Sequence, residues 1–396
     1  MHIFLDISPI IFILAGISFF FSIIFIIWEY LDFRSLKKAV SNHHSYSPDI
    51  SPKEESCGVS IVVYAGSNTA VLARNLPKIL DQDYPLYEVI VVNDGKSEST
   101  SDFIERISLQ HKNLHYSFTP DDARNLSRKK LALMLGIKAA QYDIILTTNS
   151  NCTPQSRHWV SSIARHFSNG ADVVIGHSRL SENSDTGRGC RLRSFIYMKN
   201  TIKYLVQAIQ RKPYRGTSDN LAYRKSLFLS HKGFSQSMHL HYGDDDLFVN
   251  EIAIHGNTHV ELSPESIITV SHDNPAKALQ TLKLHRTFSE SKIRSSAFFL
   301  ENLKTAIYIL NIMLIAGIAL LGFNNPIIIA ALVFAAAIMF IPQIITYRKT
   351  AETLQLRKLL FSIPIFTLLT PAVEWHYKIK CRRHKSYFYT WQPLKS

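Results

Sequence analysis

Long apolar stretches stand at both ends of the chain, and the middle has a shorter alternating pattern of apolar and polar positions. Pro9–Trp28 holds no charged residue, and its length is enough for a helix to cross a bilayer. Because it lacks a basic n-region and a small-residue cleavage site, it predicts a retained anchor. Thr305–Phe323 and Pro326–Thr346 predict two further spans. Only Asn324 and Asn325 separate them, so they predict a transmembrane hairpin.

A fourth apolar segment, Leu359–Val373, is shorter and contains Pro364 and Pro371. It predicts a re-entrant or interfacial helix. Basic residues flank the spans on one side: Arg34, Lys37 and Lys38 after the first, and Arg348, Lys349, Arg357 and Lys358 after the third. Since short loops rich in Lys and Arg stay in the cytoplasm, both flanks are predicted to be cytosolic.

In the middle of the chain, short β-branched runs alternate with amphipathic segments. The runs predict strands at Val59–Tyr64, Glu88–Val92, Leu114–Phe118, Asp143–Thr148 and Asp172–Gly176. The amphipathic segments predict helices at Thr69–Leu80, Thr100–Gln110, Asn125–Ala140 and Ser156–Phe167. This alternation predicts an α/β fold with a largely parallel sheet covered on both faces. Ligands of such sheets bind at the carboxyl ends of the strands.

The chain has 396 residues and a formal net charge of +13. Much of the basic excess lies beside the apolar spans and in the tail after Val373, where Lys and Arg alternate with Trp and Tyr. This placement favours an anionic membrane surface over nucleic acid as the partner.

Two acidic features are candidates for chemistry. Asp244, Asp245 and Asp246 are consecutive, and like charges at this spacing repel unless a metal, a cation or a reacting hydroxyl uses them. A solvated helix N-terminus is the alternative. Asp94 stands in the turn at 93–95, directly after a predicted strand. A carboxylate there can accept hydrogen bonds from a ribose or a base edge, although a plain turn explains it equally.

The order of these features resembles the glycosyltransferase family 2 enzymes of the GT-A fold, especially bacterial membrane-bound members with one N-terminal span and a C-terminal hairpin. The resemblance covers residues 59–247, and its most specific part is QDYP at 82–85 followed by EVIVVNDG at 88–95. It implies that Asp94 contacts the nucleoside of an activated sugar. It also implies that Lys130 brings positive charge to the nucleotide, with a solvated helix position as the alternative.

The family carries an acidic D-x-D element after its fourth strand, which holds a divalent ion on the diphosphate. Here the matching positions are Asn149 and Asn151, followed by Cys152 and Pro154 as in the family. An amide oxygen coordinates Mg²⁺ or Mn²⁺ without adding negative charge, so a divalent cation is expected with weakened affinity. Three outcomes stay open: an ion held by the diphosphate and the Asp run, basic side chains in its place, or binding without turnover.

The Asp run matches the place of the family's G-E-D or G-D-D element. The resemblance implies that Asp245 deprotonates the acceptor hydroxyl, with Asp244 as its neighbour and Asp246 as the alternative base. A single displacement with one base inverts the anomeric centre, so one well-placed carboxylate suffices.

Three further residues are implied by the resemblance. Asn220 would line the acceptor side, unless it caps a turn. Arg286 and His285 would clamp the pyrophosphate, at the place where processive relatives carry Q-x-x-R-W. The Gln and Trp of that motif are missing here, which argues against a processive polymer synthase.

These observations predict six regions: an anchor (1–40), a linker (41–57), a GT-A domain (58–274), an interfacial segment (275–304), a transmembrane hairpin (305–346) and a cytosolic loop with an apolar segment and a basic aromatic tail (347–396). The expected protein is a multi-pass inner-membrane glycosyltransferase of a bacterium with a cytosolic catalytic domain. It would move a sugar from a nucleotide-diphosphate donor to a lipid-linked or surface-glycan acceptor in polysaccharide biosynthesis at the cell envelope. A catalytically degenerate sugar-nucleotide scaffold or sensor at the membrane is the alternative.

Overall fold

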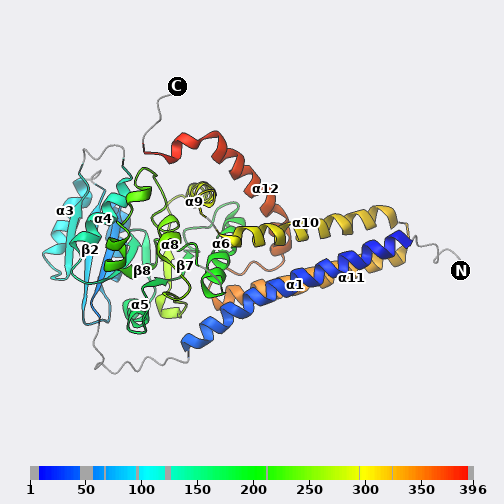
Figure 1. The fold of residues 1–396 in the computed structure, drawn as a ribbon, viewed down its shortest axis with the longest axis horizontal. Helices are drawn as coiled ribbons and strands as arrows, with labels where there is room; N and C mark the ends of the chain where they lie inside the picture. Colours follow the sequence, from blue (N-terminus) through cyan, green and yellow to red (C-terminus); the bar gives the residue numbers. More distant parts are fainter. Residues whose placement is uncertain are drawn as a thin grey trace.

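The computed structural model describes residues 9–44, 57–66, 68–94, 98–120, 126–210, 213–293, 295–322 and 324–390. Most of the predicted linker therefore lies outside the described residues. An α/β domain occupies one end of an elongated molecule, and long helices extend from it (Figure 1). The first residues of α1 (Pro9–His44) lie at the far end of these helices, away from the α/β domain.

The apolar ends of the chain pack together as a bundle of α1, α10 (Ser296–Gly322) and α11 (Pro326–Thr353). Among the described residues, these three helices are long and apolar enough to cross a membrane, in agreement with the three predicted spans. α1 continues to His44, and its C-terminal part is not a free tether, because Leu36 and Val40 are buried in the core of the α/β domain.

The main sheet has seven strands in the order β3-β2-β1-β4-β8-β6-β9. Its strands are β1 (Val59–Ala65), β2 (Tyr87–Asn93), β3 (Leu114–Phe118), β4 (Ile144–Asn149), β6 (Val173–Ile175), β8 (Leu221–Arg224) and β9 (Thr258–Val260). The predicted parallel pairing holds for β3, β2, β1 and β4. β8 is not among the strands that the hydrophobic pattern predicts, although the family resemblance implies a loop and strand at Gly216–Arg224; it runs antiparallel to both β4 and β6.

Alternate residues of the central strands face opposite sides of the sheet, where two apolar cores form. Val62 and Ile90 pack in one core with α4 (Arg128–Ala139), and Ile61 and Val89 pack in the other with α2 (Thr69–Leu80) and α5 (Trp159–Ser168). α3 (Glu98–Ser108) contacts β2 and β3. α4 lies close to β1 because residue 136 is Gly: a Cβ there would stand 2.6 Å from Val62 Cγ1.

A second sheet, which the sequence analysis did not predict, has the order β5-β10-β7. β10 (Ile268–Val270) pairs antiparallel with β5 (Cys152–Pro154) and parallel with β7 (Ser178–Leu180). This sheet holds the end of β10, and hence residues 271–274, beside the carboxyl ends of β1 and β4.

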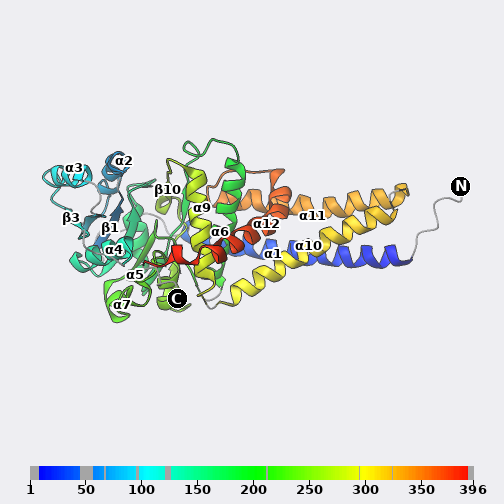
Figure 2. The same ribbon diagram turned by 90° about the horizontal axis from the view of Figure 1, so that it is seen from above.

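Three helices connect the α/β domain to the bundle: α6 (Cys190–Gln210), α9 (Pro275–Glu290) and α12 (Ser362–Arg383). α12 contacts α6, α9 and α11, and it runs from the base of the bundle back along the α/β domain (Figures 1 and 2). The remaining short elements are α7 (Lys225–Ser230), α8 (Leu247–Ile252) and 3₁₀ turns at Ser235–Ser237, Pro264–Ser266 and Lys385–Phe388.

Candidate active site

A cavity of about 650 Å³ lies at the carboxyl ends of β1 and β4, and residues of α9 close one side of it. Its lining brings together side chains from segments that are far apart in the sequence: Tyr64, Lys129, Asn149, Asn151, Arg215, Asp219, Asp244, Asp245, Asp246, His285 and Arg286. Most of the residues singled out from the sequence therefore meet in one place. Asp94, Lys130 and Asn220 are not part of this lining.

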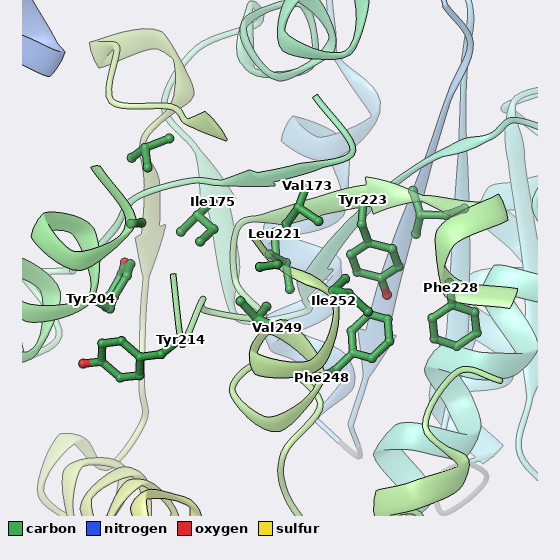
Figure 3. Close-up of a cluster of buried hydrophobic side chains, with 14 of the residues drawn as sticks. Val173, Ile175, Tyr204, Tyr214, Leu221, Tyr223, Phe228, Phe248, Val249 and Ile252 are labelled. Carbon is green, nitrogen blue, oxygen red and sulfur yellow. The ribbon is translucent and has the colours of Figure 1, made fainter. Parts of the chain in front are cut away.

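A tight turn and an aromatic cluster position the Asp run. Gly243 has φ +106°, a conformation in which a Cβ would also stand 2.8 Å from Leu247 Cγ. Directly after the run, Phe248 of α8 packs against Tyr223 of β8 with ring centroids 5.2 Å apart (Figure 3). Because both Phe248 and Val249 are buried, the three carboxylates are held at the edge of the core.

Asp244 is paired with a cation. Its Oδ2 lies 2.6 Å from Lys129 Nζ, which also donates to Ser218 Oγ at 2.8 Å. Burial favours the neutral acid, but Lys129 outweighs it and lowers the pKa of Asp244 below its ordinary value. Asp244 is thus a fixed negative charge that holds Lys129 in the cavity.

Asp246 holds the structure together. Its Oδ1 accepts a hydrogen bond from the Leu247 backbone N at 2.8 Å and so caps α8. Its Oδ2 accepts from Ser289 Oγ and lies 3.5 Å from Arg215 Nη2. With both oxygens engaged in this way, Asp246 is poorly suited to act as the alternative base.

Asp245 has a different environment. Its Oδ2 accepts a hydrogen bond from the Ser218 backbone N at 3.3 Å, and no cation of the described residues forms an ion pair with it. Burial, and then the charges of Asp244 and Asp246, raise the pKa of Asp245 to about 7. A carboxylate with such a pKa accepts a proton more readily than an ordinary Asp near neutral pH.

The structure corrects the choice of lysine. Lys130 is fully buried, and its Nζ donates to Ser237 O and Tyr242 O, both at 2.7 Å. It therefore supports the loop before the Asp run and does not face the cavity. Lys129 faces the cavity in its place, because successive residues of a helix point about 100° apart.

Asn220 also has a structural role. It is fully buried, its Oδ1 accepts from Trp159 Nε1 at 3.0 Å, and its Nδ2 donates to His177 O and Ser266 O. The expectation that it lines the acceptor side is wrong. The neighbouring Asp219 lines the cavity instead, and the sequence analysis missed it although it lies in the same segment.

Asn149 and Asn151 line the cavity, but their surroundings do not form a metal cage. Asn149 Nδ2 donates to Asp219 Oδ1 at 2.7 Å, and Asn151 Nδ2 donates to Ser271 O at 3.2 Å. Within the described residues, no group of three or more His, Cys, Asp or Glu side chains is placed to hold a metal ion. This donor set does not fit a divalent cation bound by the protein alone.

Asp94 directly follows β2 and is buried just behind the cavity. The Tyr64 hydroxyl, which lines the cavity, donates to Asp94 Oδ2 at 3.5 Å. Arg128 Nε donates to the Asp94 backbone O at 2.9 Å. Burial, followed by the charge of Asp94, raises the pKa of Tyr64 to about 12, so this hydroxyl keeps its proton at neutral pH and donates it to Asp94, while its oxygen can accept a hydrogen bond from a ligand.

The predicted clamp, Arg286 and His285, lines the cavity from α9. Arg286 is 9% exposed, and its Nη1 has no hydrogen-bond partner among the described residues. Burial lowers the pKa of His285 to about 3, with Lys129 as a further cause, so its imidazole is neutral at pH 7. Arg286 is therefore the cation of this pair, and a phosphate group would satisfy its buried donor.

Residues 59–231 match the family model described as glycosyl transferase family 2. Over these residues the chain is similar to the family 2 glycosyltransferases. The match includes the strand that leads to Asp94 and the segment with Asn149 and Asn151, but it ends before the Asp run. No curated protein sequence matches the chain.

Solved structures add a likeness in fold. The mannosyltransferase PcManGT from Pyrobaculum calidifontis, in complex with GDP-Man and Mn²⁺, matches with a TM-score of 0.57 at 15% identity, over 91% of this chain and 99% of that chain. S. aureus TarS 1–349 matches with a TM-score of 0.40 at 15% identity, over 83% of this chain and 91% of that chain. The likeness to the mannosyltransferase confirms the predicted GT-A fold of the α/β domain.

Proposed function

We propose that this protein is a membrane-anchored glycosyltransferase that moves one sugar from a nucleoside-diphosphate donor to an acceptor hydroxyl. The observation that carries the proposal is the position of Asp245: it is a carboxylate with a raised pKa, without an ion pair among the described residues, in a cavity that also holds Lys129 and Arg286. A base and positive charge in one cleft are what displacement at an anomeric carbon requires.

In the proposed reaction, the acceptor oxygen forms the new bond to the anomeric carbon while the bond from that carbon to the diphosphate breaks. Asp245 takes the proton of the acceptor hydroxyl, and the nucleoside diphosphate leaves with the electron pair. Attack and departure on opposite faces invert the anomeric centre. Arg286 and Lys129 stabilise the charge that develops on the leaving diphosphate.

The nucleoside of the donor is proposed to lie near Asp94, at the end of β2, as the family resemblance implies. GDP-Man and Mn²⁺ are present in the mannosyltransferase structure, which supports a nucleotide sugar as the donor class and makes a divalent cation a cofactor to test. Because Asn149, Asn151 and Asp219 do not form a metal cage, no step of the proposed reaction runs through a metal held by the protein alone.

The proposed location is the inner membrane of a bacterium, with the catalytic domain in the cytosol. The basic flanks support this orientation. The first flank, with Arg34, Lys37 and Lys38, is the part of α1 whose Leu36 packs into the α/β domain. The second flank begins at Arg348, next to Tyr347, which packs against Phe195 of α6. Both positive flanks therefore lie at the end of the bundle that carries the domain.

The substitution Asp245→Asn tests the proposal. It keeps the size of the side chain and removes the base, so the rate of sugar transfer should fall by about 100-fold or more. The affinity for the donor, measured by titration calorimetry, should be unchanged. Asp102→Asn, an exposed position on α3, is the matched control and should transfer sugar normally. Full activity of Asp245→Asn would contradict the assignment. Donor binding without turnover in the unsubstituted protein, over a broad set of donors and acceptors, would support a scaffold or sensor instead.

A further inference from the structure

A second cavity, of about 580 Å³, lies between the α/β domain and the membrane helices. Residues of α6, α9, α12 and the first turns of α10 line it. Six of its lining residues are basic and two, Glu290 and Glu374, are acidic. The basic residues are Lys203, Lys283, Arg286, Lys292, Lys378 and Arg382. We call this space the basic cavity.

The two glutamates of the basic cavity, Glu290 and Glu374, offset its positive charge only in part, because six basic residues line the same space. Lys283 is 7% exposed, and among the described residues its Nζ has neither a hydrogen bond nor an ion pair. Burial lowers the pKa of Lys283 to about 8. Arg286 brings a second buried donor, Nη1, without a partner in the described part of the chain. Buried cations without partners are costly, and a bound anion would remove that cost.

The membrane helix α10 forms one wall of the basic cavity. Phe298 and Asn302 line it, and both belong to the candidate span Ala297–Gly322. Lys203 Nζ lies 5.1 Å from the centroid of the Phe298 ring. The cavity is therefore at the level where this helix would enter the bilayer, and a lipid headgroup can reach it while its tail stays in the membrane.

The side chains of α12 also indicate that the basic cavity lies at the membrane surface. Its exposed large apolar side chains are spaced as one face of a helix: Ile365, Leu368, Leu369 and Trp375. Its Lys378 and Arg382 line the basic cavity. An apolar face beside a basic face is typical of a helix that lies in the membrane interface.

The basic cavity and the active-site cavity share Arg286. Lys283 and Arg286 are three residues apart on α9, so they lie on the same side of that helix. A group bound at Lys283 is therefore next to the wall of the cavity that contains Asp245. This arrangement suits an acceptor that is anchored by its phosphate and reacts at a hydroxyl farther along.

We propose that the basic cavity binds the phosphate-bearing headgroup of a lipid-linked acceptor. The inference rests on the proposed function, because it names the acceptor class for the same active site. The phosphate is bound and not chemically changed. The wall formed by α10 favours a lipid over a soluble phosphate compound, and the buried cations favour a phosphate over a neutral lipid.

The binding test uses the full-length protein in nanodiscs of phosphatidylcholine that contain a long-chain polyisoprenyl phosphate. Native mass spectrometry measures bound lipid. The double substitution Lys283→Met with Lys378→Met should weaken binding by about tenfold or more, since it removes two charge-assisted contacts. Lys349→Met with Lys380→Met removes the same charge outside the cavity lining and should bind as the unsubstituted protein does. Lys283→Arg keeps the charge and should retain binding.

Three results would overturn the inference. Equal loss of binding in the two double variants would mean that only net charge matters. Equally tight binding of the neutral polyisoprenol, of phosphatidylglycerol or of inorganic phosphate would remove the assignment to a phosphate-bearing acceptor lipid. If Lys283→Met with Lys378→Met raised the KM for the donor and left the KM for the lipid acceptor unchanged, the basic cavity would belong to the donor.

The binding measurement requires no turnover, so it separates this inference from the proposed function. If no sugar transfer is found but the polyisoprenyl phosphate binds as described, the proposed reaction fails and the lipid site remains. If transfer occurs and lipid binding is unchanged in Lys283→Met with Lys378→Met, the lipid site fails alone.

Discussion

Lys129 Nζ lies 2.6 Å from Asp244 Oδ2, while the next acid along the chain, Asp245, forms no ion pair with the described residues. One cation therefore divides two adjacent carboxylates into different states. Asp244 stays ionised beside Lys129, and its charge helps to raise the pKa of Asp245 to about 7. The run of like charges that looks unfavourable in the sequence gives Asp245 the pKa that the proposed base needs near neutral pH.

The substitution Lys129→Met should remove both the pair and the positive charge in the cavity. Asp244 is 5% exposed at its side chain, so an unpaired charge there would cost about 3 kcal/mol or take up a proton. We expect a lower Tm of the detergent-solubilised protein and weaker donor binding. Lys138→Met, at an exposed position of the same helix, is the control. An unchanged Tm would show that the ion pair contributes little.

The pKa of Asp245 predicts the pH dependence of transfer. A base must be deprotonated, so kcat/KM should fall by about tenfold for each pH unit below about 7. Rising pH has the opposite effect on stability. Because the pKa of Asp245 is raised in the folded state, the folded protein keeps a proton that the unfolded chain loses. The resulting contribution to the free energy of unfolding disappears as pH rises toward 7. A profile of initial rates against pH, at saturating donor, measures the first effect. A flat profile between pH 5 and 8 would exclude Asp245 as the base.

The amide at residue 149 predicts how far Mn²⁺ raises the Tm of the protein. Asn149 Nδ2 donates to Asp219 Oδ1 at 2.7 Å, so Asn149→Asp replaces a hydrogen bond with two carboxylates in contact. Without metal, we expect Tm to fall by about 2 to 4 °C. Added Mn²⁺ should restore it, because two carboxylates bind hard divalent ions better than one.

A thermal shift assay with and without Mn²⁺ measures this response. The unsubstituted protein should show a smaller shift with Mn²⁺ than Asn149→Asp does. Asn169→Asp changes an exposed amide at the end of α5 and should respond to Mn²⁺ like the unsubstituted protein. If Mn²⁺ stabilises the unsubstituted protein as strongly as the variant, the amides already form an effective metal site.

The substitution Asn220→Ala distinguishes a structural residue from one that binds the acceptor. It leaves Trp159 Nε1 and Ser266 O without their partner and removes one of the two hydrogen bonds to His177 O, and each unsatisfied buried group costs about 1 to 3 kcal/mol. We expect a large fall in Tm, with the KM for the acceptor unchanged in protein that remains folded. Asn169→Ala is the exposed control. A raised acceptor KM at normal Tm would restore Asn220 to the acceptor side.

Most of the fold could be predicted because it depends on local patterns. The spans follow from uncharged apolar length, and β1, β2, β3 and β4 follow from short apolar runs between amphipathic helices. β8 and the sheet β5-β10-β7 could not be predicted in this way. Their strands have three or four residues, which is too short for a clear period, and their partners lie far away in the sequence.

By itself, the sequence determined the membrane helices, the α/β order and a set of polar residues near the ends of the strands, since these depend on neighbouring residues alone. Only the tertiary structure decided which member of each adjacent pair is available in the cavity: Lys129 and not Lys130, and Asp219 and not Asn220, line it. Asp245 and Asp246 both line it, but both oxygens of Asp246 are already engaged. The physical reason is that neighbouring side chains point in different directions, and their partners come from distant segments. Arg215 and Ser289 bind Asp246, and Trp159 binds Asn220, so no local pattern contains this information.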